Sequence, residues 1–390
     1  MDIFAKCYAK SMADQAREQG LYPYFRALES RQDIEVIMEG KRRIMLGSNN
    51  YLGLTTNPEI IEAGIHAIEQ FGTGCSGSRF LNGTLTMHLE LEDALAKFLR
   101  KEGVVTFSTG YTSNLGIIAA LVSKNDYVIC DRENHASIYD GCKLSYGKML
   151  RYRHSDMASL ERRLQEVPEN CGALIVTDGV FSMSGDIAKL PEICALAQKY
   201  GARVMVDDAH GLGIIGEGGR GTASYFGLED QVDIYMGTFS KSLASLGGYI
   251  AADARICDYV RHAARAHIFT ASIPPACCAV ALAALRHLEA HPELVDHLTA
   301  LSDYGRERYR AYDIPIIEST TPIIPIYTYD MIRTLQVQKD IYENGVYVNA
   351  VLPPACLPGE CLLRTSLMAT LTESLIDEAA GIMSEVLHRA

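Results

Sequence analysis

The feature that most constrains the fold is a repeated alternation of short apolar runs with segments of helical periodicity. The apolar runs are typical of strands and occupy residues 104–108, 126–131, 173–178, 203–208, 233–238 and 247–252. Between the first four runs lie segments with a helical spacing of apolar residues, such as 160–167 and 190–200. This rhythm predicts a mostly parallel sheet with helices on both faces.

The pattern changes from about Pro274 onward. Helices are expected over 274–291, 293–312, 331–344 and from 373, with the strand-like stretches IIPIYTY, VYVNAVLPP and LLRTSL between them. This mixture predicts a smaller α+β domain. The first twenty residues predict an amphipathic helix, and a strand pair follows in IEVIMEGKRRIMLGS. We therefore divide the chain into an N-terminal arm (1–47), a large domain (48–282) and a C-terminal domain (283–390).

Charge and composition exclude several classes of partner. The net charge is −12, which disfavours a nucleic-acid groove or an anionic membrane surface as the main partner. No stretch approaches 18 uncharged apolar residues, so at most a peripheral membrane contact is expected. The eleven cysteines form no CxxC pair, which argues against a zinc site. We expect a soluble cytoplasmic protein without a bound metal.

The stretch RVMVDDAHGLGIIGEGG (203–219) contains a G-x-G-x-x-G pattern at Gly211, Gly213 and Gly216. A dinucleotide-binding turn needs its first glycine at the strand end and a helix after the third. Here the residues DDAH intervene, and the following EGGRG cannot begin a stable helix. The glycines more plausibly let a loop turn sharply beside a ligand.

Polar residues follow the strand-like runs where a ligand crevice forms in an open α/β sheet. Asp207 ends one run, and Lys241 follows the next within GTFSKSLASLGG, flanked by Thr238 and Ser240. The lysine amine could form a Schiff base and the hydroxyls could bind a phosphate. Taken alone, Lys241 is better explained as an exposed lysine on a serine-rich loop.

Three further strand ends add to this set. FSTGYTSNLG places Gly110 and Tyr111 at a helix start, where backbone N–H groups suit a phosphate. His135 follows another strand and could stack on a flat ring, and TDGVFSMSGD adds Asp178 and Ser182. A lysine, an aspartate, histidines and phosphate donors in one crevice are what pyridoxal 5'-phosphate requires.

At this point the sequence resembles the α-oxoamine synthases, which are fold-type I pyridoxal-phosphate enzymes, over essentially the whole chain. The motifs that carry the resemblance are SNNYLGL, GTGCSGSRFLNGT, HLELE, FSTGY, NHASIYDG, TDGVFSMSGD, VDDAHGLG, GTFSKSLASLGG, FTASIPP and LLRTSLMAT. The resemblance implies an aspartate-aminotransferase-like fold: a large domain built on a mostly parallel seven-stranded sheet, and a smaller α+β C-terminal domain.

The resemblance also implies a role for each matching residue. Lys241 would hold the cofactor as a Schiff base and shuttle protons, and Asp207 would pair with the pyridine nitrogen. His210 would bond the phenolic oxygen of the ring, and His135 would stack on the ring and help orient the amino-acid carboxylate. The other cofactor-binding residues would be Gly110, Tyr111, Ser182, Thr238 and Ser240.

In this family the site lies at the interface of a homodimer. The segment FTASIPP, with Thr270 and Ser272, would therefore reach the phosphate of the neighbouring subunit. Arg364 would bind the substrate carboxylate, with Asn50 nearby, because the planar fork of a guanidinium matches a carboxylate.

The family joins an amino acid to an acyl-CoA with loss of CO2. SRFLNGT and the Pro-Pro-Ala loop before Arg364 are similar to the serine palmitoyltransferase branch of bacteria. The implied reaction condenses L-serine with a long-chain acyl-CoA, palmitoyl-CoA, to 3-ketosphinganine. Cysteate, glycine or alanine could replace serine. Cysteate would require an extra cation, for which Arg79 is a conceivable source. The aromatic residues in GLYPYFRALE (20–29) could line an acyl entrance or simply pack in the core.

Other functional classes are weaker alternatives. An aminotransferase or cysteine desulfurase would use the same Lys241 and Asp207 without an acyl-CoA. A cofactor-binding regulator or inactive scaffold is disfavoured by the intact lysine. Metal hydrolases and serine hydrolases fit poorly, since the acidic residues and histidine around 207–210 lack a companion ligand pair and no G-x-S-x-G occurs.

Overall fold

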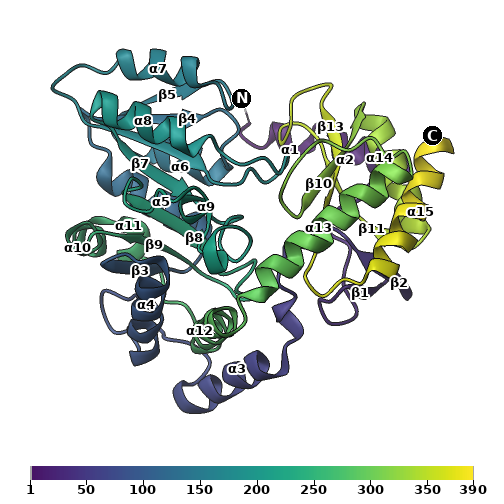
Figure 1. The fold of residues 1–390 in the computed structure, drawn as a ribbon, viewed down its shortest axis with the longest axis horizontal. Coiled ribbons are helices and arrows are strands. Elements are labelled where there is room, and N and C mark those ends of the chain that lie inside the picture. The colour runs from purple at the N-terminus through teal and green to yellow at the C-terminus, as the bar shows by residue number, and fades with distance from the viewer. Residues whose placement is uncertain (1, 390) are drawn as a thin grey trace.

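The computed structural model of the protein describes residues 2–389 and is built around a seven-stranded sheet (Figure 1). From edge to edge the strands are β3 (Gly103–Phe107), β9 (Gly248–Ala252), β8 (Ile234–Thr238), β7 (Arg203–Asp207), β6 (Ala173–Asp178), β4 (Tyr127–Asp131) and β5 (Lys148–Tyr152). Only β9 runs antiparallel to its neighbours among these strands. The carboxyl ends of the other six strands therefore meet at one edge of the sheet.

The six apolar runs correspond to six of these strands, and the predicted mostly parallel sheet is confirmed. The seventh strand, β5, has the sequence KMLRY and lies at the edge of the sheet. Its two charged residues are exposed while Leu150 and Tyr152 are buried, which is the alternation of an edge strand with one covered face. This short alternation is too weak to stand out as an apolar run.

Helices cover both faces of the large sheet, as the sequence predicts. Along β7, Val204 and Val206 join one hydrophobic core while Met205 joins another on the opposite face. The helices of this region are α3 (Pro58–Phe71), α4 (Thr86–Leu99), α5 (Gly110–Leu121), α6 (Ala136–Leu144), α7 (Met157–Gln165), α8 (Leu190–Tyr200), α9 (Thr222–Phe226), α10 (Ala254–Ala263), α11 (Arg265–Ile268) and α12 (Pro275–Ala290), with short 3-10 turns η1 (Leu54–Thr56) and η2 (Glu217–Gly219).

A third core lies in the C-terminal part of the chain. It is formed around an antiparallel sheet of β10 (Ile323–Tyr329), β13 (Cys361–Ser366) and β12 (Asn349–Val351), with helices α13 (Glu293–Ala311), α14 (Met331–Glu343) and α15 (Glu373–Arg389). The predicted N-terminal strand pair, β1 (Glu35–Met38) and β2 (Lys41–Met45), packs into the same core through β11 (Val346–Tyr347). The boundaries at 47 and 282 stay predictions.

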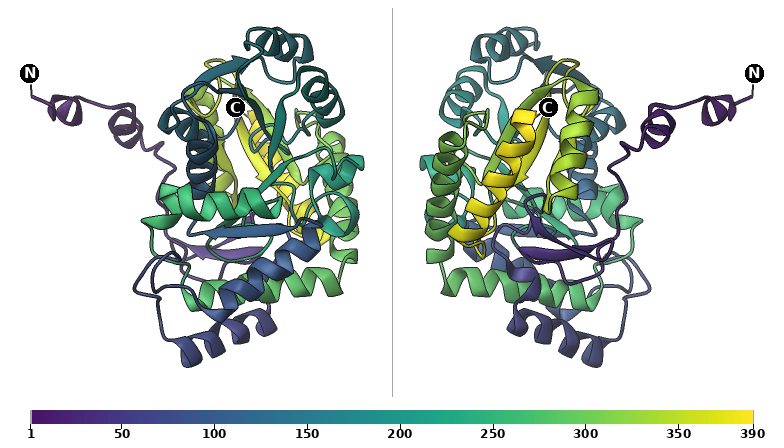
Figure 2. Two further views of the ribbon diagram at one scale, coloured as in Figure 1. Left: turned by 90° about the vertical axis from the view of Figure 1, so that its left-hand side faces the viewer. Right: turned by 90° about the vertical axis from the view of Figure 1, so that its right-hand side faces the viewer.

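The N-terminal segment differs from the single amphipathic helix that the sequence predicts. Two short helices form, α1 (Ala5–Tyr8) and α2 (Met12–Glu18), because the chain is extended at Ala9 and Ser11 caps a new helix with Asp14. Neither helix contains a buried residue, and the arm extends away from the body in both views of Figure 2. Among residues 2–389, no helix has both the length and the apolar character needed to cross a membrane.

Candidate active site

The candidate site lies where the strands of the large sheet end. Asp178 and Asp207, the last residues of β6 and β7, are register partners, and Thr238 ends β8 next to them. A cavity of about 250 Å³ opens above these ends. Its lining includes most of the cofactor-binding residues predicted from the sequence: Gly110, Tyr111, His135, Ser182, Asp207, His210, Thr238, Ser240 and Lys241.

Asp207 is buried and held in a fixed orientation. One carboxylate oxygen accepts a hydrogen bond from Asn114 Nδ2 at 2.7 Å, and the other accepts from the backbone N–H of Ala209 at 3.0 Å. The side chain is 4% exposed, so water contributes little to its solvation. A buried carboxylate of this kind attracts a positive charge placed in the cavity.

Lys241 lies in the loop after β8 and lines the same cavity. Burial lowers the pKa of its amine to about 8, Asp207 opposes that change, and the positive charge of Arg364 adds to it. A lowered pKa increases the fraction of neutral amine near pH 7. The neutral amine is the form that acts as nucleophile or base.

His210 belongs to a chain of buried hydrogen bonds that reaches the C-terminal sheet. Its Nδ1 lies 2.7 Å from the hydroxyl of Tyr51, which accepts from Arg364 Nη2 at 3.0 Å. Burial places the pKa of His210 well below its usual range, and the cations Lys241 and Arg364 lower it further. His210 is therefore a neutral imidazole at physiological pH.

Arg364 comes from β13 and is 4% exposed. Its guanidinium also donates to the carbonyl of Ser182, to Ser366 Oγ at 3.2 Å and to Asn49 Oδ1 at 3.0 Å. These contacts fix the plane of the fork, while Arg364 still lines a cavity together with Lys241. A fixed arginine beside a reactive amine suits an amino-acid carboxylate.

His135 lies in the turn that follows β4, and its side chain caps the start of α6. Its backbone N–H donates to Asp178 at 3.0 Å, and its Nδ1 lies 2.7 Å from Ser137 Oγ. Burial lowers the pKa of the imidazole, with Asp207 opposing and Lys241 adding to the shift. The ring of Tyr111 meets the imidazole edge-on, with the ring centroids 6.3 Å apart.

The start of α5 forms a cradle for an anion. Thr109 caps the helix by accepting from Thr112, which leaves the first N–H groups, those of Gly110 and Tyr111, without partners inside the helix. A Cβ on Gly110 would lie 2.8 Å from Thr238 Cβ, so only glycine allows the helix to approach β8 this closely. Thr238 Oγ1 and Ser240 Oγ, 2.9 Å apart, add hydroxyl groups to the N-terminal end of the helix.

The glycine-rich stretch after Asp207 has a structural explanation. Gly213 and Gly216 have φ angles of +74° and +81°, which glycine adopts at low cost. A Cβ on Gly211 would lie 1.9 Å from the carboxylate of Asp208, which is buried and accepts from the N–H and hydroxyl of Thr222. Only the three-residue 3-10 turn η2 follows Gly216 before the chain turns again, in agreement with the sequence argument against a dinucleotide turn.

Four predicted residues lie outside the 250 Å³ cavity: Arg364, which lines a neighbouring cavity, and Asn50, Thr270 and Ser272. Asn50 donates to Thr55 Oγ1 at 2.7 Å and lines a separate cavity of about 430 Å³ that Lys241 and Ser240 share. Asn49, rather than Asn50, contacts Arg364. Thr270 and Ser272 line none of the cavities around Lys241, and Ser272 bonds instead to the carbonyl of Gly77. Their roles stay predictions.

Arg79 is occupied by neighbours inside its own chain. Its guanidinium contacts both carboxylate oxygens of Glu92, at 2.8 Å and 3.2 Å, and donates to Thr106 Oγ1 at 2.6 Å. The side chain is 8% exposed and lines none of the cavities around Lys241. Arg79 thus neutralises a buried glutamate on α4.

The largest of the three cavities that Lys241 lines has a volume of about 660 Å³. Lys241, His210 and Arg364 all form part of its lining. Its walls are mainly apolar and come from α2 and the segment after it, from α14, and from the end of β12 and the loop that follows: Met12, Ala13, Ala16, Tyr22, Tyr24, Met331, Ile332, Leu335, Val351, Leu352, Pro353 and Pro354. This places the predicted aromatic entrance residues Tyr22 and Tyr24 at the cavity wall.

The residues present fit pyridoxal 5'-phosphate group by group. The helix start at Gly110 with the hydroxyls of Thr238 and Ser240 suits the phosphate, the buried carboxylate of Asp207 suits a protonated ring nitrogen, and the amine of Lys241 suits the aldehyde. Each donor matches a chemically different part of the same molecule.

Three residues of this network were not assigned from the sequence. Asn114 and Tyr51 hold Asp207 and His210, and Asn49 holds Arg364. All three lie inside motifs that the sequence analysis quotes, FSTGYTSNLG and SNNYLGL. The only available signal was therefore their position within those motifs.

Comparison with known proteins agrees with this geometry. Residues 41–382 match the family described as aminotransferase class I and II. The chain is 48% identical to the serine palmitoyltransferase of Sphingobacterium spiritivorum, over 97% of this chain and 95% of that protein. It is 50% identical to that of Bacteroides thetaiotaomicron, over 93% and 92%. An 8-amino-7-oxononanoate synthase of Thermoanaerobacter pseudethanolicus is 39% identical, over 97% and 96%.

Solved structures give the same result. The serine palmitoyltransferase of S. paucimobilis with bound PLP and myriocin superposes with a TM-score of 0.97 at 37% identity, covering 100% of this chain and 99% of that one. That of Sphingomonas wittichii gives a TM-score of 0.95 at 36% identity, with the same coverage. The predicted fold-type I architecture and the pyridoxal-phosphate cofactor are confirmed. The chain belongs to the aminotransferase class I and II family, and within it to the α-oxoamine synthases, which are acyltransferases dependent on pyridoxal 5'-phosphate.

Proposed function

We propose that the protein condenses L-serine with a long-chain acyl-CoA, palmitoyl-CoA, to give 3-ketosphinganine, CoA and CO2. One observation carries the proposal: a mainly apolar cavity of about 660 Å³ is lined by the reactive amine of Lys241 and by the fixed guanidinium of Arg364. The apolar wall suits a long acyl chain, and Arg364 beside Lys241 suits the carboxylate of an amino acid. The similarity to proteins named serine palmitoyltransferase supports the same reading.

Each site residue has a defined task in this reaction. Pyridoxal 5'-phosphate, when bound, supplies an electron sink for the pair released at the amino acid's α-carbon. Asp207 would hold a proton at the ring nitrogen of the bound cofactor. The neutral His210 would bond the phenolic oxygen of the same ring without adding a charge. Arg364 orients the carboxylate. Lys241, with its pKa lowered to about 8, removes the proton from the α-carbon and later returns one.

The choice of serine over cysteate rests on charge. A sulfonate on the β-carbon would need a cation of its own, and Arg79 is already bound to Glu92. The cationic side chains that line the 660 Å³ cavity are Lys241 and Arg364, and both are assigned to other groups of the substrate. A neutral hydroxymethyl group needs no additional charge.

The assay that tests this function measures CoA release from palmitoyl-CoA with the holoprotein. L-Serine, cysteate, glycine and alanine are supplied in turn, and the ketone product is identified by mass spectrometry. We expect L-serine to give the highest kcat/KM. Preference for another amino acid would contradict the serine assignment. Keto-acid or sulfide formation without CoA release would point to an aminotransferase or desulfurase instead.

We also propose that the enzyme works as a homodimer in the cytoplasm. Thr270 and Ser272 line none of the three cavities that contain Lys241 in their own chain. This is expected if they serve the phosphate site of a second subunit. A reducing compartment is consistent with eleven scattered cysteines that form no paired motif.

A further inference from the structure

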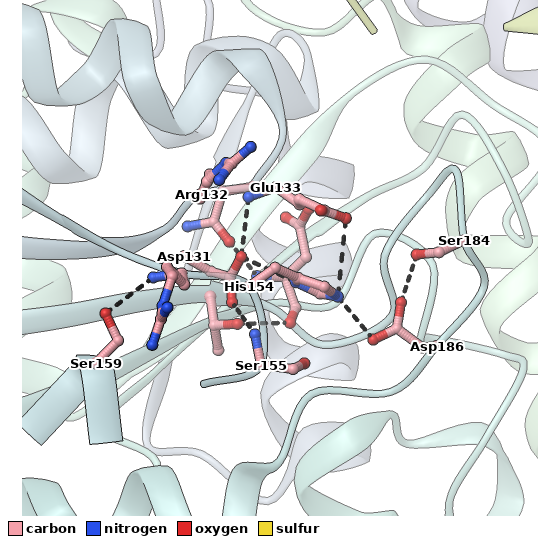
Figure 3. Close-up of polar contacts among 12 residues, drawn as sticks. Asp131, Arg132, Glu133, His154, Ser155, Ser159, Ser184 and Asp186 are labelled. Carbon is pink, nitrogen blue, oxygen red and sulfur yellow. Dashed lines mark hydrogen bonds and ion pairs between the residues drawn. The ribbon is translucent and has the colours of Figure 1, made fainter. Parts of the chain in front are cut away.

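A second polar cluster, partly buried, lies outside the cavities that Lys241 lines, and Figure 3 shows its contacts. His154, which follows β5, is surrounded by three carboxylates. Its Nδ1 lies 3.0 Å from Asp131 Oδ1, and its Nε2 lies 3.1 Å from Asp186 Oδ2 and 3.8 Å from Glu133 Oε2. We call these four residues the His154 cluster.

The cluster requires a protonated imidazole. A neutral histidine has one N–H and one lone pair, so one of its nitrogens would face a carboxylate without a proton between them. Burial by itself would lower the pKa of His154, but the hydrogen bonds with Asp131 and Asp186 raise the pKa to about 10. His154 therefore stays a cation at physiological pH and joins two carboxylates.

The carboxylate on one side of the imidazole is fixed to the large sheet. Asp131 is the last residue of β4 and is 1% exposed. It also accepts hydrogen bonds from the backbone N–H groups of Glu133 and Ser155, at 2.9 Å and 3.0 Å. Because Asp131 is itself buried and two of its donors are backbone N–H groups, it gives His154 a rigid anchor.

The carboxylate on the other side belongs to the loop 180–187. Asp186 accepts from Ser184, and its backbone carbonyl accepts from Phe181 N at 3.0 Å, which closes the loop on itself. The ring of Phe181 packs edge-on against the imidazole, with centroids 4.5 Å apart. His154 thus holds this loop through an ion pair and an aromatic contact.

The same loop reaches the substrate side of the site. The carbonyl of Ser182 accepts from Arg364 Nε, and Ser182 lines the cavities that contain Lys241. The carbonyl of Gly185 accepts from Thr321 Oγ1 at 2.8 Å, next to β10. A continuous set of contacts therefore joins His154 to the guanidinium of Arg364.

We propose that His154 is a positioning residue that, by joining Asp131 to Asp186, holds the loop 180–187 so that Ser182 fixes Arg364 in the orientation that binds the amino-acid carboxylate. The inference rests on the proposed function, in which Arg364 takes that carboxylate. His154 itself lines none of the cavities around Lys241, so it acts through the loop and not by touching the substrate.

The test replaces His154 with glutamine, which keeps much of the volume and removes the positive charge. The holoprotein is titrated with L-serine, and binding is followed by the change in cofactor absorbance. We expect the dissociation constant for serine to rise about tenfold, the size of effect that follows when one hydrogen bond to a charged group is weakened. The KM for palmitoyl-CoA should not change.

A matched control is available on α3. His66 also lies between two carboxylates, with Nε2 3.1 Å from Glu62 and Nδ1 3.3 Å from Glu69, but its side chain is 67% exposed and contacts no active-site loop. His66→Gln should leave serine binding unchanged.

If His154→Gln does not fold, Asp186→Asn on the exposed side of the cluster gives the same test. In the variant that carries both changes, the loss of serine-binding free energy should be smaller than the sum of the losses in the two single variants.

Hydrogen exchange of the cofactor-free protein provides a readout that needs no activity. The amides of Phe181 and Gly185, which bond within the loop, should exchange faster in His154→Gln than in the unmodified chain. Unchanged serine affinity in both cluster variants, or an equal loss of palmitoyl-CoA affinity, would overturn the proposal. Absence of any serine-induced spectral change in the unmodified protein would instead refute the proposed function.

Discussion

At the scale of single residues, the lowered pKa of Lys241 leads to a prediction about cofactor binding. Only the neutral amine attacks an aldehyde, so the rate at which the cofactor-free protein takes up pyridoxal 5'-phosphate should rise with pH through about 8 and then level off. Stopped-flow absorbance between pH 6.5 and 9.5 measures this rate. Lys241→Ala should show no covalent uptake, whereas Lys124→Ala, on an exposed turn, should behave like the unmodified protein. A rate independent of pH would contradict the assignment.

Side chains at strand ends could be predicted from the sequence, and their hydrogen-bond partners could not. Asp207 and Lys241 could be placed because the carboxyl ends of parallel strands meet at one edge. Asn49 and Asn50 are adjacent, and the sequence offers no way to tell which one contacts Arg364. Similarly, the carboxylate that binds Arg79 lies on α4, and only the folded chain brings the two together.

At the scale of elements, strongly periodic segments were predicted well and weakly periodic ones were not. The helix predicted over 190–200 is found as α8 with the same bounds, because its apolar residues, a proline in the first turn and Gly201 at the end all agree. β5 was missed because only one of its faces is covered. The N-terminal helix was predicted too long, since no core contact favours helix through Ala9 and the Ser11 cap begins a new one.

The start of α5 allows a test of the proposed phosphate site. Gly110→Ala adds a Cβ that would lie 2.8 Å from Thr238, and should push the helix start away from β8 and weaken cofactor affinity by roughly tenfold or more. Alanine favours helices more than glycine, so any loss would not come from helix propensity. The control is Gly381→Ala in α15, where the nearest atom is 4.0 Å away. Fluorescence titration of the cofactor-free protein measures both affinities.

At the scale of the whole molecule, one apolar surface suggests how two subunits meet. The segments around Ser78 and Ala271 pair through a β-bridge, and beside it Leu81 and Phe269 are 77% and 78% exposed. Large apolar side chains gathered next to a binding site are typical of a protein interface. Thr270 lies in the same segment, so a second subunit on this surface would bring its hydroxyl toward the partner's site.

Phe269→Glu should therefore disrupt the homodimer proposed above, because it places a charge in an apolar interface. Light scattering after size-exclusion chromatography should report a monomer, and the variant should bind the cofactor more weakly. Tyr146→Glu changes an equally exposed aromatic residue before β5, near the opposite edge of the sheet, and should remain dimeric. A dimeric Phe269 variant with full cofactor affinity would show that this surface is not the interface.

Lys241 lines all three cavities described above, of about 250, 430 and 660 Å³. These spaces differ in character: the smallest carries Asp207, the second is rimmed by serine and asparagine side chains, and the largest has apolar walls. An inhibitor attached covalently to this amine can be extended into any of the three cavities, each of which has walls of a different chemical character. From this single attachment point, the potency and the selectivity of such an inhibitor can be optimised separately.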